Sequence, residues 1–199
     1  MIPVLPQPEP PHFEVKVRQR GQRWLTQHGI AMAGPLPSDT DLPAYWRDVL
    51  DDLHAAYGGV CSYLCVFVSR VTGGATVDHF VAKSGLAGQA YEWTNYRFAS
   101  GRMNARKRAF DDVLDPFELQ AGTFHIEFVD LAIFPSPHLT LTQQEAAQQT
   151  IDRLGLDLPW ARRERAELFE EYVAGHVDAD FLRRRSPFVW HEASRQGLL

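Results

Sequence analysis

Two apolar segments, residues 60–71 and 75–81, flank the pair Gly73-Gly74, and this arrangement constrains the fold more than any other feature of the chain. Both segments are rich in β-branched residues, which favour strands. Paired glycines are typical of a turn. The sequence therefore predicts a hairpin, followed by a loop at 84–96 and a helix at 104–111. Together these parts make a strand–strand–helix unit.

The segments on either side of this unit are predicted to be helices and short strands. Apolar residues recur at helical spacing in 42–57, and Gly58-Gly59 ends that pattern. Thr142 is the expected cap of a later helix, because Glu145 lies three residues further on. The predicted helices are residues 15–28, 42–57, 140–154, 159–174 and 178–185. The predicted strands outside the hairpin are residues 124–129 and 131–134.

The predicted elements place the chain in the α+β class with four regions. Five of the first twelve residues are proline, which fixes φ and lacks an N–H donor, so we expect an extended leader there. The regions are a proline-rich leader at 1–12, an N-terminal helical region at 13–59, the strand–strand–helix core at 60–117, and a C-terminal strand and helical region at 118–199.

The charge of the chain is unevenly distributed. With 25 acidic and 20 basic residues the net charge is -5, which counts against simple nonspecific adhesion to nucleic acid. Between Trp93 and Phe110, however, five basic residues occur without an acidic one. A local positive face on an acidic protein fits an enzyme that meets phosphate at one place.

The sequence shows no sign of export or membrane insertion. It contains no run of eighteen apolar residues, and its first residues lack the basic and long apolar parts of a signal peptide. Two cysteines are too few for a disulfide framework or a four-cysteine zinc site. We therefore expect a cytoplasmic protein without membrane contact.

Four polar residues stand in an order that suits chemistry on phosphate. Asp78 and His79 are neighbours near the end of the second predicted strand, and Asn95 and Asn104 follow in the loop and at the helix start. The oxygens of Asp78 and Asn104 suit Mg²⁺, which can stabilise a developing negative charge. A histidine can take a proton from water. This order suits a one-metal site that cuts phosphodiester bonds.

The pair Asp78-His79 sets a condition on the strand that carries it. Neighbouring residues of a strand point to opposite faces, so these two share a site only if the strand ends or bulges there. The exit into the loop near Lys83 permits this. Asn95 is then expected to hold the loop, or to fix the imidazole tautomer through its backbone.

Three segments of the chain resemble those of HNH endonucleases, whose core is the ββα-metal fold. They are Val77-Asp78-His79-Phe80, Tyr91-Glu92-Trp93-Thr94-Asn95 and Asn104-Ala105-Arg106-Lys107. The likeness is nearest to the bacterial branch that includes retron-associated and other defence-linked HNH proteins. An Asp-Pro-Phe segment follows in that branch, as Asp115-Pro116-Phe117 does here. The resemblance covers about residues 60–117.

The resemblance implies metal-dependent endonucleolytic cleavage of DNA, with Mg²⁺ or Mn²⁺ as cofactor and a regulatory or defence-system protein as a partner. It implies His79 as the general base, Asp78 and Asn104 as metal ligands, and Asn95 as the residue that fixes the active loop. From charge and position we add the expected nucleic-acid contacts, which are Lys83, Arg97, Arg102, Arg106 and Lys107.

The chain departs from many HNH proteins at their structural zinc site, which is built from two Cys-x-x-Cys knuckles. Here Cys61 and Cys65 have three residues between them, and Ser100 and Met103 stand where the second pair belongs. We therefore expect no structural zinc, and expect Cys61 and Cys65 to be buried as small apolar side chains.

Two alternative interpretations remain open. In the first, the protein is a catalytically silent nucleic-acid-binding or assembly subunit that has the HNH fold. In a purely structural reading, His79 pairs with its neighbouring acid and Asn104 only caps its helix. The basic residues of 97–108 then form a solvated helix face.

Overall fold

The computed structural model describes residues 1–199, which form two compact units. The central unit comprises residues 6–59 and 69–111, and the C-terminal unit comprises residues 1–5, 60–68 and 112–199. Each unit combines helices with one two-stranded antiparallel sheet, which confirms the α+β class. None of the helices is long and apolar enough to cross a membrane.

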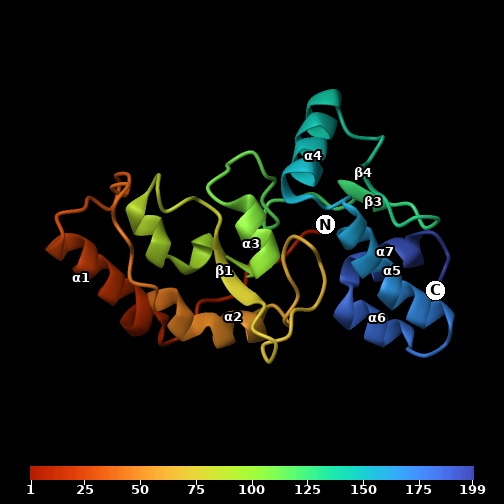
Figure 1. Ribbon diagram of the computed structural model, residues 1–199, viewed down its shortest axis with the longest axis horizontal. Helices are drawn as coiled ribbons and strands as arrows, with labels where there is room; N and C mark the ends of the chain where they lie inside the picture. The colour runs from red at the N-terminus through yellow and green to blue at the C-terminus, as the bar shows by residue number, and fades with distance from the viewer. The chain divides into compact units, whose positions relative to one another are not determined.

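The sheet of the central unit pairs β1 (Ala75–His79) with β2 (Tyr96–Ser100), with Ala75 opposite Ser100 and His79 opposite Tyr96. The predicted hairpin is therefore wrong in its partner, because β1 pairs with a later segment instead of residues 60–71. β2 starts at the end of the expected loop, where its first four residues are buried. The helix α3 (Gly101–Lys107) follows β2 directly and packs against both strands (Figure 1).

Residues 60–71 form turns instead of the predicted strand. Cys65 has a φ of 56°, in the left-handed region that a strand residue does not adopt. Its N–H donates to the carbonyl of Cys61 at 2.8 Å, which closes a tight turn between the two cysteines. Only Val60 and Phe67 form an isolated antiparallel bridge. Consecutive buried residues here signify a packed turn, since they do not alternate as in a half-exposed strand. This turn belongs to the C-terminal unit, whereas the sequence had placed it in the core region.

The helix α3 begins three residues earlier than predicted. The hydroxyl oxygen of Ser100 accepts a hydrogen bond from the backbone N–H of Met103 at 3.3 Å, so Ser100 is the N-cap. The reading of Asn104 as a cap is therefore wrong. The helix ends at Lys107, before the predicted Asp111, because Arg108 turns into a backbone conformation with φ of 51°.

The rest of the central unit consists of short helices joined by turns and irregular segments. The predicted helices at 15–28 and 42–57 are confirmed, although each is divided into two shorter pieces. The leader is extended and is held in place, since Trp93 Nε1 donates to the carbonyl of Gln7 at 2.8 Å. The helical elements before α3 are η1 Glu14–Arg18, α1 Gln19–Gln27, η2 Tyr45–Val49, α2 Leu50–Ala56, η3 Ala87–Tyr91 and η4 Trp93–Asn95.

The C-terminal unit combines four helices with a short sheet of β3 (Phe124–Ile126) and β4 (Ile133–Pro135), against which α4 and α7 pack (Figure 1). Thr140, not Thr142, caps the first helix in a capping box with Gln143. The last helix was missed by the sequence analysis; Pro187 lies in its first turn, where a missing N–H costs nothing. The helices are α4 Leu141–Leu154, α5 Pro159–Val173, α6 Ala179–Arg185 and α7 Pro187–Arg195.

Two buried charged residues join the parts of the C-terminal unit. The guanidinium of Arg165 on α5 donates to the carbonyls of Leu131 and Leu156 at 2.6 to 3.0 Å. Glu192 on α7 is fully buried and its carboxylate accepts from the backbone N–H of Ile126 at 3.1 Å and from Arg195 at 2.8 Å. Burial acts to raise the pKa of Glu192, but these hydrogen bonds outweigh it and lower the pKa below the ordinary 4.5.

We predict that Glu192→Gln lowers the free energy of unfolding at pH 7 by about 2 kcal/mol. The glutamine side chain keeps only one acceptor oxygen, and its NH₂ group, which is a donor, then lies against other donors. Since the folded carboxyl has the lower pKa, its stabilisation is complete above pH 4.5 and is lost as the pH falls through the folded value. The two proteins should therefore converge in strong acid. Denaturant unfolding from pH 7 to 3 measures this. Glu164→Gln, at an exposed position of α5, is the control and should change little.

Candidate functional site

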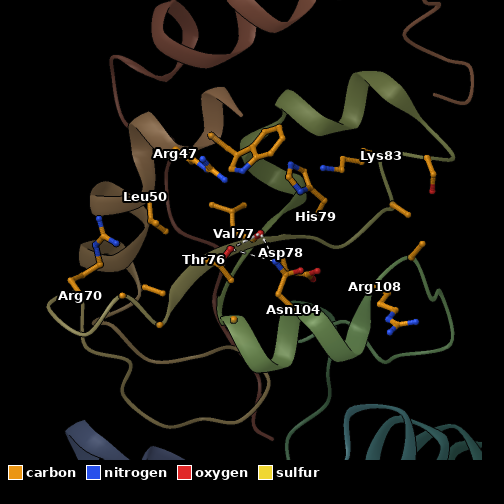
Figure 2. Close-up of a pocket in the computed structure, with 18 residues that line it drawn as sticks. Arg47, Leu50, Arg70, Thr76, Val77, Asp78, His79, Lys83, Asn104 and Arg108 are labelled. Carbon is orange, nitrogen blue, oxygen red and sulfur yellow. Dashed lines mark hydrogen bonds between the residues drawn. The ribbon is translucent and has the colours of Figure 1, made fainter. Parts of the chain in front are cut away.

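A cavity of about 780 Å³ opens in the central unit beside the sheet. Its lining combines β1, α3, η2 and the segment 82–84, and Figure 2 shows the side chains that face it. Asp78, His79 and Asn104, predicted from the sequence to act together, all line this cavity. The condition on the strand is also met, because β1 ends at His79.

The imidazole of His79 is held in one orientation at the cavity. Its Nε2 lies 3.0 Å from the carbonyl oxygen of Ala90, and since a carbonyl only accepts, Nε2 carries the proton. Nδ1 makes no hydrogen bond within the protein, and His79 does not bond its neighbouring acid. The rings of Trp46 and Tyr96 stand edge-on to the imidazole at centroid distances of 4.6 and 5.3 Å. His79 therefore presents a fixed tautomer with its unprotonated nitrogen available.

His79 is neutral at physiological pH. Burial, together with the ammonium groups of Lys83 and Lys107, lowers the pKa of His79 from 6.5 to about 4, against the opposing effect of the Ala90 carbonyl. A neutral imidazole is the form that can take a proton from water.

Asn95 closes the long loop between β1 and β2. Its Oδ1 accepts from the backbone N–H of Val81 at 2.7 Å, and its Nδ2 donates to the carbonyls of Val81 at 3.0 Å and Gln89 at 2.9 Å. The backbone carbonyl of Asn95 also accepts from Phe80 at 3.0 Å. Gln89 precedes Ala90, so Asn95 fixes the segment that orients His79. The imidazole itself is held by Ala90, not by the backbone of Asn95.

Asp78 is only 1% exposed although it lines the cavity. The ammonium of Lys107 lies 3.9 Å from its carboxylate and donates to the carbonyls of Phe80 at 2.8 Å and Phe110 at 3.3 Å. The Lys107 ammonium thus lies beside the Asp78 carboxylate inside the fold, where an opposite charge offsets part of the cost of burying a carboxylate.

Asn104 lies on α3 and reaches toward β1. Its Nδ2 donates to the carbonyl of Val77 at 3.2 Å and to the hydroxyl of Thr76 at 3.4 Å, as the dashed lines in Figure 2 show. With its nitrogen used in this way, the Oδ1 of Asn104 remains as an acceptor. No group of three or more His, Cys, Asp and Glu side chains is placed to share a metal ion. The candidate metal ligands are thus one carboxylate and one amide oxygen.

The predicted nucleic-acid contacts divide into buried and accessible residues. Arg97 is 4% exposed and donates to the carbonyls of Thr94 and Tyr96, and Lys107 is fully buried. Both cations act inside the fold, which differs from their expected place on an open basic face. Lys83 lines the cavity, with its ammonium 4.8 Å from the Trp46 ring centroid, and burial lowers the pKa of Lys83. Arg102 is exposed and Arg106 is half-buried, and neither lines the cavity.

The positions of the missing zinc knuckles are occupied by residues with other roles. Cys61 and Cys65 are buried free thiols in the C-terminal unit. Ser100 caps α3, and Met103 is fully buried beneath that helix.

Several cavity residues were missed by the sequence analysis. Trp46 and Arg47 lie on η2, Arg70 lies before the Gly73-Gly74 turn, and Arg108 follows α3. The first three come from outside the strand–loop–strand–helix unit, so only the folded chain reveals that they face Asp78 and His79. Arg108 belongs to the basic run 97–108, which was the one available signal for it.

No protein-family model matches this chain, and no curated protein is significantly similar to it.

We predict that Asn95→Ala lowers the free energy of unfolding by roughly 2–4 kcal/mol, because it removes two hydrogen bonds to the backbone of Val81 and one to the carbonyl of Gln89. Denaturant unfolding of the purified variant measures the change. Thr94→Ala, at the exposed position just before it, is the control and should stay within about 0.5 kcal/mol of the wild type. Equal effects at the two positions would contradict the role given to Asn95.

Proposed function

We propose that this protein is a metal-dependent endonuclease of the HNH type, which hydrolyses phosphodiester bonds of DNA on a ββα-metal core formed by β1, β2 and α3. The observation that carries the proposal is the convergence of Asp78, His79 and Asn104 on one cavity, with the His79 tautomer fixed by Ala90. The order strand, long loop, strand and helix is that of the ββα unit, and Asn95 closes the loop.

The donor atoms at the cavity fit a hard divalent cation. Asp78 offers a carboxylate and Asn104 an amide oxygen, and Mg²⁺ in proteins is commonly bound by one or two such groups together with water. Asp78 and Asn104 would hold the ion. When bound, Mg²⁺ or Mn²⁺ supplies stabilisation of the negative charge that develops on the phosphate and the leaving oxygen.

His79 supplies the base. The Nδ1 lone pair takes a proton from a water molecule as the water oxygen bonds to phosphorus, and the bond from phosphorus to the leaving oxygen breaks. The leaving oxygen then acquires a proton from solvent. The hydrogen bond from Nε2 to Ala90 stabilises the imidazolium that forms, as a carbonyl acceptor favours the charged ring.

The cations around the cavity support a phosphate substrate. Arg47, Arg70, Lys83 and Arg108 line it, and Asp78 is the only acidic residue that does so. A cavity with this balance attracts anions such as phosphates and disfavours cations of the same size.

A catalytically silent nucleic-acid-binding subunit is the second candidate. The observation that favours it is the burial of Asp78 against Lys107, because a carboxylate engaged by an internal ammonium is a poorer metal ligand. Both candidates bind DNA, so cleavage separates them.

We predict that purified protein relaxes supercoiled plasmid with Mg²⁺ or Mn²⁺ but not with EDTA, and that His79→Ala lowers the rate by about 100-fold or more, because the general base is lost. Gel electrophoresis over time measures both rates. His138→Ala, at an exposed histidine of the C-terminal unit, should cut at the wild-type rate.

An equal rate in His79→Ala would refute the mechanism. Absence of metal-dependent cutting by the wild type, with DNA binding retained, would favour the silent subunit.

A further inference from the structure

Two of the cations that line the cavity have no acidic partner. The guanidinium of Arg47 makes no hydrogen bond or ion pair within the protein, and the residue is exposed. Arg70, by contrast, is bound by Asp51 at 2.6 Å, so its charge is largely compensated. Arg108 is also exposed, and its only side-chain bond is from Nε to the carbonyl of Ala105 at 3.3 Å.

The backbone keeps Arg108 in an unusual conformation. Its φ of 51° and ψ of -130° lie in a region that side chains other than glycine rarely adopt, at a cost of about 1–3 kcal/mol. It is not the left-handed helical conformation in which Gly155 ends α4, with φ of 64° and ψ of 38°. A long basic side chain at this position is therefore not explained by the helix end, and it projects from α3 at the cavity.

The two arginines lie on opposite sides of the candidate catalytic residues. In Figure 2, Arg47 lies on one side and Arg108 on the other, with His79, Asp78 and Asn104 between them. A nucleic-acid strand is a repeating anion, so cations on both sides of a cutting centre meet phosphates on both sides of the bond that is cut.

We propose that Arg47 and Arg108 are positioning residues that bind the phosphates flanking the scissile one, so that the substrate is a strand extending past the cut in both directions. This inference rests on the proposed nuclease function. Arginine suits the role because its planar fork donates two parallel hydrogen bonds to phosphate oxygens. A site with this arrangement cleaves within a strand and disfavours terminal nucleotides, which lack a phosphate on one side.

The test is equilibrium binding of a fluorescein-labelled 20-base-pair duplex DNA in EDTA, where no cleavage interferes, measured by fluorescence anisotropy over a range of salt concentrations. Arg47→Ala and Arg108→Ala are compared with the wild type. Arg23→Ala is the matched control, because Arg23 is an exposed arginine of the same unit, has no ion pair, and does not line the cavity. Circular dichroism and thermal unfolding check that each variant is folded.

We expect each cavity variant to bind DNA about tenfold more weakly at 0.1 M salt, with the slope of log K against log salt reduced by about 0.9. A change in slope reports a lost phosphate contact, which a merely structural effect does not produce. The control should keep the wild-type affinity and slope. In the double variant the two losses should add, since the residues contact separate phosphates.

Cavity variants with wild-type slopes would overturn the inference, as would an equal loss in Arg23→Ala or a wild type that does not bind the duplex. The plasmid assay keeps the two proposals apart. Metal-dependent cutting that requires His79, together with unchanged slopes, removes this inference and leaves the nuclease. Reduced slopes without any cutting remove the nuclease and leave a strand-binding groove.

Discussion

The rest of the candidate site depends on the hydrogen bonds that the side-chain amide of Asn95 makes to the loop backbone. The loop between β1 and β2 is long, and it contains only short single turns that have little stability of their own. Through Val81 and Gln89, Asn95 ties the beginning of the loop to its middle, while its own position at the start of β2 fixes the end. The carbonyl of Ala90 is thereby held where it orients His79. One amide thus supplies the order that the loop backbone lacks.

The placement of charge follows a second constraint, which is that buried cations need acceptors. Arg97 and Lys107 are enclosed by the central unit, and each donates to backbone carbonyls there. The exposed cations at the cavity have fewer internal partners. The basic run 97–108 therefore serves two purposes, since some of its charges hold the fold and others face the solvent.

The sequence located most of the helices and the strands β1, β3 and β4, but it missed β2 and α7 and gave β1 the wrong partner. Helical spacing and stop signals located α4, α5 and the two N-terminal helices, because these features are local. The pairing of β1 with β2 depends on contacts across the long loop, and the apolar run at 60–71 was misread because a buried turn and a strand have the same composition. The short strand β2 is only partly apolar, because Arg97 is buried at its second position.

The sequence predicted the candidate site in part. The order of Asp78, His79, Asn95 and Asn104 suggested that they act together, and the structure brings three of them to one cavity with Asn95 behind it. The partner of the His79 ring is a backbone carbonyl, which leaves no mark in the sequence. Arg47 and Trp46 come from a helix whose pattern only indicated burial, so their place at the cavity required the fold.

The two compact units are not consecutive stretches of the chain. The polypeptide passes from one unit to the other at residues 5–6, 59–60, 68–69 and 111–112. No single cut in the chain therefore separates the two units: a fragment that ends at residue 111 carries the whole central unit together with residues 1–5 and 60–68 of its neighbour. A deletion series would confuse loss of activity with loss of folding. The chain must be dissected instead by excising or replacing the inserted segment 60–68, whose ends both connect to the central unit.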